Sequence, residues 1–168
     1  MTRKETTKFL SDLLVNTKFS GIGKYYASEV TLDYGTNDVR RVDFMEFVPE
    51  NQISISGIEK GYFVCYEVKS CVEDYKSGNG RNFIGEKNYF VMPMETYKCL
   101  NTELNANYYY VGVMVPVPFM RDTYDEFENP TPFDADTAWD LRIINPCHPQ
   151  SRKKSMAELL FCMLRAGR

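Results

Sequence analysis

Two carboxylates and a lysine stand on stretches that read as neighbouring strands. Asp43 lies within residues 40–48, and Glu67 and Lys69 end the mostly apolar run 62–70. Side chains on a strand alternate between its two faces, so Glu67 and Lys69 point the same way. If the two strands pair antiparallel, Asp43 comes opposite Glu67 on one face. Two carboxylates that close repel each other unless a cation lies between them or one carries a proton.

A hard divalent cation with oxygen ligands, Mg²⁺ or Mn²⁺, is the usual partner of such a carboxylate pair. Lys69 would then stand beside a metal-bound water, where it can orient that water and stabilise negative charge on a phosphoryl group. The three residues therefore predict metal-assisted hydrolysis of phosphodiesters. A second interpretation stays open, in which the strand ends in solvent and Glu67 and Lys69 form only a surface ion pair.

Length and composition are those of one ordinary domain. The chain has 168 residues, 43% of them hydrophobic and 26% charged, which is typical of a globular protein with its own core. No apolar run reaches the roughly 18 residues that a membrane-spanning helix needs, and the first residues lack the apolar core of a signal peptide. We therefore expect a cytoplasmic protein with no membrane partner.

Cysteine and charge narrow the function further. The five cysteines include no C-x-x-C pair, which argues against a structural zinc site or a disulfide framework. His148 is the only histidine, so a Ser-His-Asp mechanism is not expected. The net charge of −3 argues against nucleic-acid binding through bulk charge but leaves room for a local basic patch.

Hydrophobic periodicity and turn residues predict the order of elements. Helices are expected over residues 2–17, 94–104 and 151–166, with a helical turn after residue 70. Strands are expected over residues 29–33, 40–48, 62–70, 88–93, 108–115 and 139–144. Residues 49–61 are expected to form a polar loop with a short extended piece at 53–55, and residues 81–87 a loop or a short helix.

This order predicts an α/β fold, an α+β mixed sheet with helices covering it. After a first helix come a three-strand antiparallel meander, a crossover and a further strand. The chain is expected to be one domain, with a core over about 2–115, a flexible segment over about 116–136 and a C-terminal strand and helix over 139–166.

The residues that carry the predicted chemistry also resemble a known family. Val42-Asp43, followed further along by Glu67-Val68-Lys69, is similar to the D…(D/E)-x-K signature of the PD-(D/E)XK, or restriction-endonuclease-like, nuclease superfamily. The amino-acid sequence around these residues resembles that of small phage and bacterial members of the MmcB-like type. The resemblance covers about residues 2–93 and implies a restriction-endonuclease-like core, with the Asp on its second strand and the E-x-K on its third.

The resemblance also implies roles for individual residues. Asp43 and Glu67 would be metal ligands, the Val68 carbonyl a third ligand, and Lys69 the catalytic lysine. Members often add a glutamate from the first helix or the region after it, and Glu29 is the candidate here. The implied cofactor is Mg²⁺ or Mn²⁺, and the implied partner is DNA.

Basic residues near these strands are candidates for phosphate contacts: Arg40, Arg41, Lys76, Arg81 and Lys87. Residues 79–81 are a candidate for a flexible loop over the scissile strand, and a solvated loop is the alternative. The tyrosines at 108–110 could stack on bases, although tyrosines in a buried strand are more often part of a core.

Three functions follow. The first is a Mg²⁺-dependent deoxyribonuclease acting in DNA repair, recombination or phage DNA metabolism. The second is a nuclease-like module that binds DNA or a protein without cutting, for example a phage factor that blocks a host defence system. The third is a small structural protein without a site. A homodimer or another protein partner is expected, because a domain this small needs help to surround a duplex.

Overall fold

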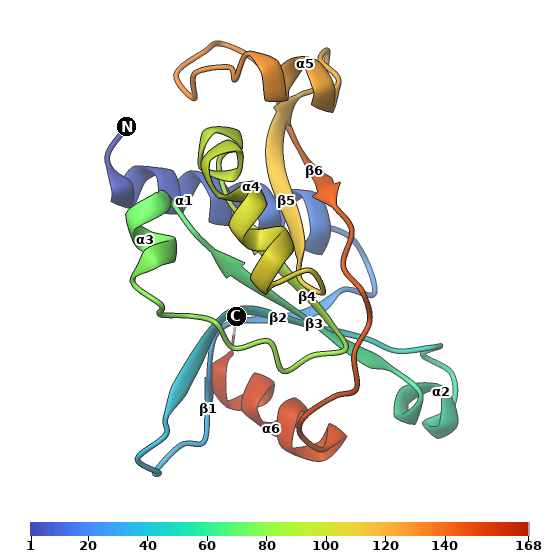
Figure 1. Cartoon of the computed structure of the whole chain (residues 1–168). Helices are drawn as coiled ribbons and strands as arrows, with labels where there is room; N and C mark the ends of the chain where they lie inside the picture. Colours follow the sequence, from blue (N-terminus) through green and yellow to red (C-terminus); the bar gives the residue numbers. More distant parts are fainter. Residues whose placement is uncertain (168) are drawn as a thin grey trace.

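A mixed sheet of six strands, in the order β1-β2-β3-β4-β5-β6, organises the molecule (Figure 1). The computed structural model describes residues 1–167. The strands are β1 (Tyr25–Leu32), β2 (Arg40–Val48), β3 (Tyr62–Val68), β4 (Lys87–Val91), β5 (Gly112–Pro118) and β6 (Trp139–Asn145). The helices are α1 (Arg3–Leu14), continued by the π-helical turn η1 (Val15–Phe19), then α2 (Ile55–Glu59), α3 (Val72–Lys76), α4 (Met94–Asn107), α5 (Thr123–Glu128) and α6 (Met156–Ala166).

The first three strands form the antiparallel meander that the sequence predicts. β1 pairs with β2 and β2 with β3, both antiparallel. β4 then lies parallel to β3, and β5 parallel to β4, while β6 returns antiparallel to β5. The α/β class with a mixed sheet is thereby confirmed.

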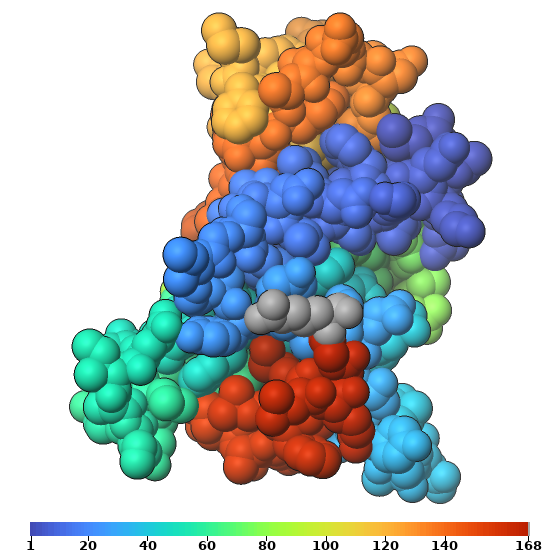
Figure 2. All heavy atoms as spheres, turned by 180° about the vertical axis from the view of Figure 1, so that it is seen from behind, coloured from blue at the N-terminus to red at the C-terminus, as the bar shows by residue number. Residues whose placement is uncertain are grey.

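Helices cover both faces of the sheet. On one face, α1 packs on β2 to β6 through Leu10 and Leu14, and Figure 2 shows it running across the middle of the molecule. On the other face, α6 packs on β1 to β3, while α3 and α4 pack on β4 and β5. Figure 1 shows the chain between α3 and β4 crossing the space between α4 and α6.

The first helix begins where the sequence places it. Thr2 is its N-cap, and its side chain and that of Glu5 form the reciprocal bonds of a capping box, which satisfies two backbone donors that the helix itself leaves free. Leu10 and Leu14 are fully buried against the sheet, and Phe9 and Leu13 are half-buried beside them. The predicted helix over 2–17 is confirmed, with its last turn wound as η1.

Several predicted boundaries are wrong. β1 begins at Tyr25 rather than at residue 29, and residues 53–55 lead into helix α2 instead of forming an extended piece. Ser54 caps that helix by accepting a hydrogen bond from the Gly57 amide, a local side-chain contact that hydrophobic periodicity does not register. Residues 81–86 form a loop without a helix.

The strand β5 is buried along its whole length, as its continuous apolar run predicts. It begins at Gly112, however, and residues 108–110 lie in the turn before it. Tyr108 packs on Tyr75, Phe83 and Phe90, so it belongs to the core. Tyr109 is exposed.

The last helix is shorter than predicted. α6 begins at Met156 with Ser155 as its N-cap, and the basic residues before it meet anions of the chain itself. Arg152 pairs with Glu86, and Lys154 pairs with Asp33. Of the predicted apolar stripe, Leu159 and Met163 are buried but Leu164 is exposed.

Part of the segment predicted to be flexible has regular structure. Its first residues complete β5, and residues further on form α5. Arg121 holds the segment together, because its guanidinium donates to Glu126 Oε2 and to the Thr131 hydroxyl, both at 2.7 Å. Within residues 1–167, no helix is long and apolar enough to cross a membrane.

Glu126 allows a test of this packing. Its side chain is 1% exposed and satisfied by Arg121 and Thr131. The substitution Glu126→Gln leaves the Arg121 guanidinium without its anion, and breaking a buried ion pair costs about 3 kcal/mol. We expect the free energy of unfolding, measured in urea, to fall by about 3 kcal/mol. An unchanged midpoint of unfolding would contradict this prediction.

Candidate active site

Glu67 lies on the sheet face that carries α4 and α6, at the boundary between two apolar clusters. Its neighbours on the same face of β3, Phe63 and Cys65, pack towards α6. Its partner in β4, Phe90, packs towards α3 and α4. The alternation predicted for this strand is confirmed, because Val64, Tyr66 and Val68 pack on the opposite face.

Asp43 lies beside Glu67, as the antiparallel pairing predicts. The register pairs Phe44 with Tyr66, so Asp43 is level with Glu67. Asp43 Oδ2 accepts a hydrogen bond of 2.8 Å from the Val68 amide, which fixes its carboxylate at the end of β3.

A local irregularity accompanies Asp43. Val42 and Met45 pack in the same cluster although they are three residues apart, so the period of two is interrupted between them. On the facing strand, Glu29 has a φ of +51°, a value rare for residues other than glycine. This break lies level with Asp43, since Ser28 pairs with Phe44 and Val30 with Val42.

Glu67 is an unsatisfied buried acid. Its side chain is 0% exposed, and among residues 1–167 neither carboxylate oxygen has a partner in good hydrogen-bond geometry, although the Asp43 carboxyl and the Asn82 amide lie near it. Burial, followed by the negative charge of Asp43, raises the pKa of Glu67 to about 9, while the Lys69 ammonium opposes this shift. Burial also raises the pKa of Asp43. At neutral pH, without a cation, Glu67 therefore holds a proton.

Lys69 is buried beside Glu67, with 3% of its surface exposed. Its ammonium donates a hydrogen bond of 2.6 Å to the Asn79 carbonyl. The interpretation of Glu67 and Lys69 as a solvated surface ion pair is therefore wrong, because both side chains are enclosed.

The chain between α3 and β4 encloses them, and we call residues 78–82 the 78–82 loop. A Cβ placed on Gly80 would lie 2.6 Å from Glu67 Oε2 and 3.0 Å from Lys69 Nζ, so only glycine fits against the two side chains. Asn82 Nδ2 donates to the Arg41 carbonyl at 2.8 Å, which ties the loop to β2. Sequence inspection places a loop here but does not show that its backbone touches Lys69.

Arg81 anchors the other side of this loop. Its guanidinium donates to the Tyr75 carbonyl at 2.6 Å and to the Tyr108 hydroxyl at 3.0 Å. It also lies over the Tyr75 ring, 4.6 Å from the ring centre. Arg81 is predicted to contact phosphate, but these bonds engage it within the fold, and no sequence motif marks the two tyrosines as its partners.

An open groove of about 690 Å³ lies next to the carboxylates. Thr31, Val39, Arg40 and Arg41 line it on the β1–β2 side, and the 78–82 loop lines it on the other. Asp43 is part of the lining, whereas Glu67 and Lys69 lie beneath the loop.

Of the other basic residues predicted to contact phosphate, two line the groove and two lie outside it. Arg40 and Arg41 line the groove, although Arg40 donates to Asp33 at 2.9 Å. Lys76 is exposed on α3 and outside the groove lining. Lys87 is level with Val64, and its ammonium covers the Tyr62 ring, at the opposite end of β3 from Glu67.

The structure does not place Glu29 at the carboxylate pair. Its side chain is 71% exposed and lies 3.7 Å from the Arg41 guanidinium. Within residues 1–167, no group of three or more acidic, cysteine or histidine side chains is arranged to hold a metal ion. Of the three side chains predicted as metal ligands, Asp43 and Glu67 lie together and Glu29 lies apart.

Two carboxylates still fit a hard divalent cation. The two oxygens of Glu67 are buried and lack donors, which is an arrangement that a cation would satisfy. Mg²⁺ keeps several waters and is commonly bound by one or two carboxylates together with substrate phosphates. The Val68 carbonyl, implied as a third ligand, belongs to the residue whose amide binds Asp43.

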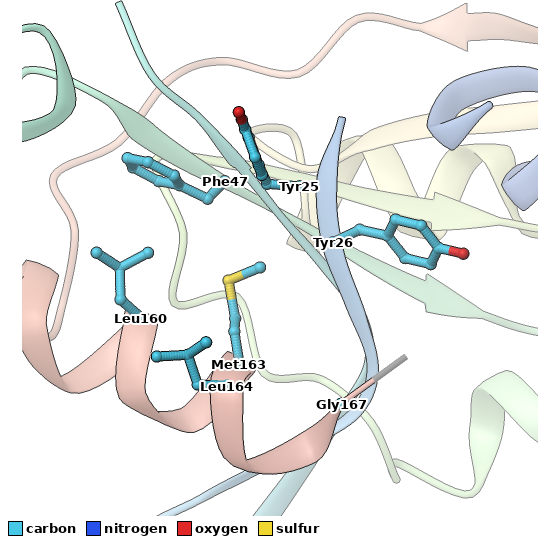
Figure 3. Close-up of a pocket in the computed structure, with 7 residues that line it drawn as sticks. All are labelled: Tyr25, Tyr26, Phe47, Leu160, Met163, Leu164 and Gly167. Atoms are coloured by element: carbon cyan, nitrogen blue, oxygen red, sulfur yellow. The ribbon is translucent and has the colours of Figure 1, made fainter. Parts of the chain in front are cut away.

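A second hollow, of about 360 Å³, lies between α6 and the start of β1 (Figure 3). Its lining is apolar apart from tyrosine hydroxyls: Tyr25, Tyr26, Phe47, Leu160, Met163, Leu164 and Gly167. Figure 3 shows Leu160, Met163 and Leu164 rising from α6 towards β1 and β2. It has no acid, base or nucleophile suited to hydrolysis, so the carboxylate site is the candidate for chemistry.

Comparison with known proteins shows only the fold. No protein-family model matches the chain, and no curated protein matches it. Among solved structures, the chain is similar to the SPO1766 protein of unknown function from Silicibacter pomeroyi, with a TM-score of 0.55 and 15% sequence identity. The match covers 93% of this chain and 82% of that one, so the two share a fold over nearly their whole length.

Proposed function

We propose that this protein is a metal-dependent nuclease with a restriction-endonuclease-like core that hydrolyses DNA phosphodiesters. The observation that carries the proposal is Glu67, a buried acid with no donor on either oxygen, enclosed with Asp43 and Lys69. A carboxylate in that state raises the free energy of the fold. A site for a divalent cation gives that arrangement a function.

The order of elements supports the proposed core. A helix precedes the meander β1–β3, Asp43 lies on its second strand and Glu67 on its third, and a crossover through α3 leads to the parallel strand β4. This is the order that the D…E-x-K resemblance implies. The groove beside Asp43 gives a path for a strand of nucleic acid.

The proposed roles follow from position. Asp43 and Glu67, with the Val68 carbonyl, would hold Mg²⁺ or Mn²⁺, which supplies a Lewis acid and lowers the pKa of a bound water. Glu67 would first have to release the proton that burial, and then the charge of Asp43, cause it to retain. Lys69 places its ammonium beside them, where it donates to a phosphoryl oxygen and stabilises the negative charge that develops there.

Cleavage of labelled DNA tests the proposal. Single-stranded and duplex DNA are incubated with the purified protein in Mg²⁺, in Mn²⁺ and in EDTA. We expect products with either cation and none in EDTA. Absence of cleavage of any DNA or RNA, together with absence of metal binding in calorimetry, would reject the proposal.

One observation favours a second function, a nuclease-like module that binds without cutting. The 78–82 loop lies on Glu67 and Lys69, and the net charge of the chain is −3. A protein in which this cover never opens would present only its outer surface to DNA or to a protein partner, as a phage factor that blocks a host defence system does. Binding of DNA or a protein without metal-dependent cleavage supports this alternative.

Arg41 tests whether the groove holds nucleic acid. Its side chain is 60% exposed and lines the groove, whereas Lys87 covers Tyr62 elsewhere. For the substitution Arg41→Ala we expect about a threefold to tenfold loss of DNA affinity and a salt dependence weaker by about one ion. Lys87→Ala is the matched control and should leave both unchanged. Equal losses in the two variants would place the DNA elsewhere.

A further inference from the structure

The side chains that the proposed chemistry needs are enclosed by their own chain. Glu67 is 0% exposed and Lys69 3% exposed, although Asp43 borders an open groove. A phosphodiester in that groove meets the 78–82 loop before it meets the lysine. Access therefore depends on where this loop lies.

We infer that the 78–82 loop is an autoinhibitory cover, which holds Lys69 and Glu67 closed and must lift before a cation or a phosphate can reach them. The inference rests on the proposed function only for the identity of the ligands that enter, a cation and a phosphate. The enclosure of Lys69 and Glu67 does not depend on that function. In the closed state, the Asn79 carbonyl occupies the lysine ammonium, so the group that would donate to a phosphoryl oxygen donates to the backbone instead.

The side-chain anchors of the cover lie at its Arg81–Asn82 end, while at its other end the Gly78 amide donates to the Tyr75 carbonyl at 3.2 Å and the Asn79 amide to the Ser77 hydroxyl at 3.4 Å. Arg81 is held by Tyr75 and Tyr108, and Asn82 is tied to the Arg41 carbonyl. Before them, Gly78 and Gly80 both have positive φ, at +77° and +65°, which glycine adopts without strain. The part that can lift is thus the stretch around Asn79 and Gly80, which lies between the two glycine positions of positive φ and next to the side-chain anchors at Arg81 and Asn82.

The contacts of the cover explain why it can close so tightly. Only hydrogens separate the Gly80 backbone from Glu67 and Lys69, because a Cβ there would overlap the carboxylate oxygen. Gly78 has a similar φ, but a Cβ there would meet nothing within 4 Å. The two glycines therefore differ in contact with the site and not in backbone conformation.

This difference supplies a matched pair of variants. Gly80→Ala adds a methyl group that wedges the loop away from Glu67 and Lys69. Gly78→Ala imposes the same kind of backbone strain in the same loop without touching the site. Asn82→Ala is a further opening variant, because it removes the bond to Arg41 from outside the site and introduces no wedge.

The readout is the accessibility of the Lys69 amine. The full-length protein is acetylated with an N-hydroxysuccinimide ester, and mass spectrometry follows the rate at Lys69 relative to the exposed Lys76. Gly80→Ala and Asn82→Ala should raise the relative rate about tenfold by populating the open state, and Gly78→Ala less than about twofold. Near-ultraviolet circular dichroism establishes that each variant is folded. If one of the two opening variants does not fold, the other alone is enough to test the cover.

The outcomes separate the cover from the nuclease. Equal Lys69 rates in all four proteins, or an equal rise in all three variants, would overturn the cover. A selective rise in the opening variants supports it, even if none of the proteins cleaves DNA, in which case only the proposed nuclease function fails. Lys69-dependent cleavage with no selective rise would retain the nuclease and reject the cover.

Discussion

Replacement of Lys69 by alanine is expected to lower the rate of Mg²⁺-dependent DNA cleavage by about a thousandfold. A group positioned for proton transfer or for stabilising developing charge contributes about 10²–10⁴ to a rate. Lys69 is the only ammonium enclosed with Asp43 and Glu67 among the described residues, since Lys76 is exposed and Lys87 covers Tyr62. No neighbouring lysine is placed to replace it.

The effect should appear in kcat rather than in DNA affinity. Lys69 lies beneath the loop, so it adds little to binding in the groove, and its loss removes an interaction made in the transition state. Lys76→Ala is the control, because this lysine is exposed on the nearby helix α3. Cleavage by Lys69→Ala at the rate of the Lys76 variant would show that the enclosed lysine takes no part in the reaction.

Replacement of Glu67 by glutamine is expected to stabilise the metal-free protein while abolishing cleavage. An amide of the same shape folds without taking up a proton, whereas Glu67 must take one up on folding at neutral pH, because burial and the charge of Asp43 raise its pKa. With a folded pKa of about 9 and an ordinary unfolded value, the folded state binds the extra proton between these two values. The contribution of Glu67 to stability is therefore greatest at low pH and falls as the pH rises through that window.

The size of this effect follows from the linkage relation. The slope due to Glu67 approaches about 1.4 kcal/mol per pH unit, so Glu67→Gln should gain about 3 kcal/mol at pH 7 in EDTA. Glu46 also has a raised pKa, and both proteins retain it, so it cancels from the difference. Asp43 and Glu67 shift each other's pKa, so the difference between the two proteins reports the titration of this pair. Urea unfolding from pH 5 to pH 9 measures it, and identical pH profiles would contradict it.

Glu126→Gln is the matched control for a buried glutamate. Glu126 is as enclosed as Glu67, at 1% and 0% exposure, but its carboxylate is bonded to Arg121 and Thr131. The same substitution is expected to destabilise at Glu126 and to stabilise at Glu67. Mn²⁺ at a hundred times its dissociation constant should then stabilise the wild type by about 2.7 kcal/mol and Glu67→Gln by much less.

The meander and its carboxylates could be predicted from the sequence because they depend on local patterns. Alternation along residues 62–68 is enough to place Glu67 and Lys69 on one face. The polar connection over residues 49–61 fits a hairpin-type loop between residues 40–48 and 62–68, and antiparallel pairing of these two strands brings Asp43 level with Glu67. Each of these predictions requires only the order of residues along one strand or the register between two adjacent strands.

The cover and the fate of the basic residues depend on contacts between distant segments. Arg81 is bound by Tyr75 and Tyr108, and nothing in the residue types separates this use from a phosphate contact. The family resemblance implies a glutamate ligand after the first helix, which makes Glu29 the candidate. In the structure its side chain is directed to solvent and to Arg41. Helix α2 begins at the Ser54 cap. A single capping serine within a polar segment is not enough to predict a helix there from the sequence.

Co-crystallisation with Mn²⁺ tests most directly whether Asp43 and Glu67 form a metal site. The proposal predicts an anomalous difference peak at the carboxylate pair, with oxygens of Asp43 and Glu67 both about 2.2 Å from the ion, and no such peak in Glu67→Gln. An ion bound without Glu67, or no ion beside Glu67 under conditions in which the protein is saturated with Mn²⁺, would contradict it.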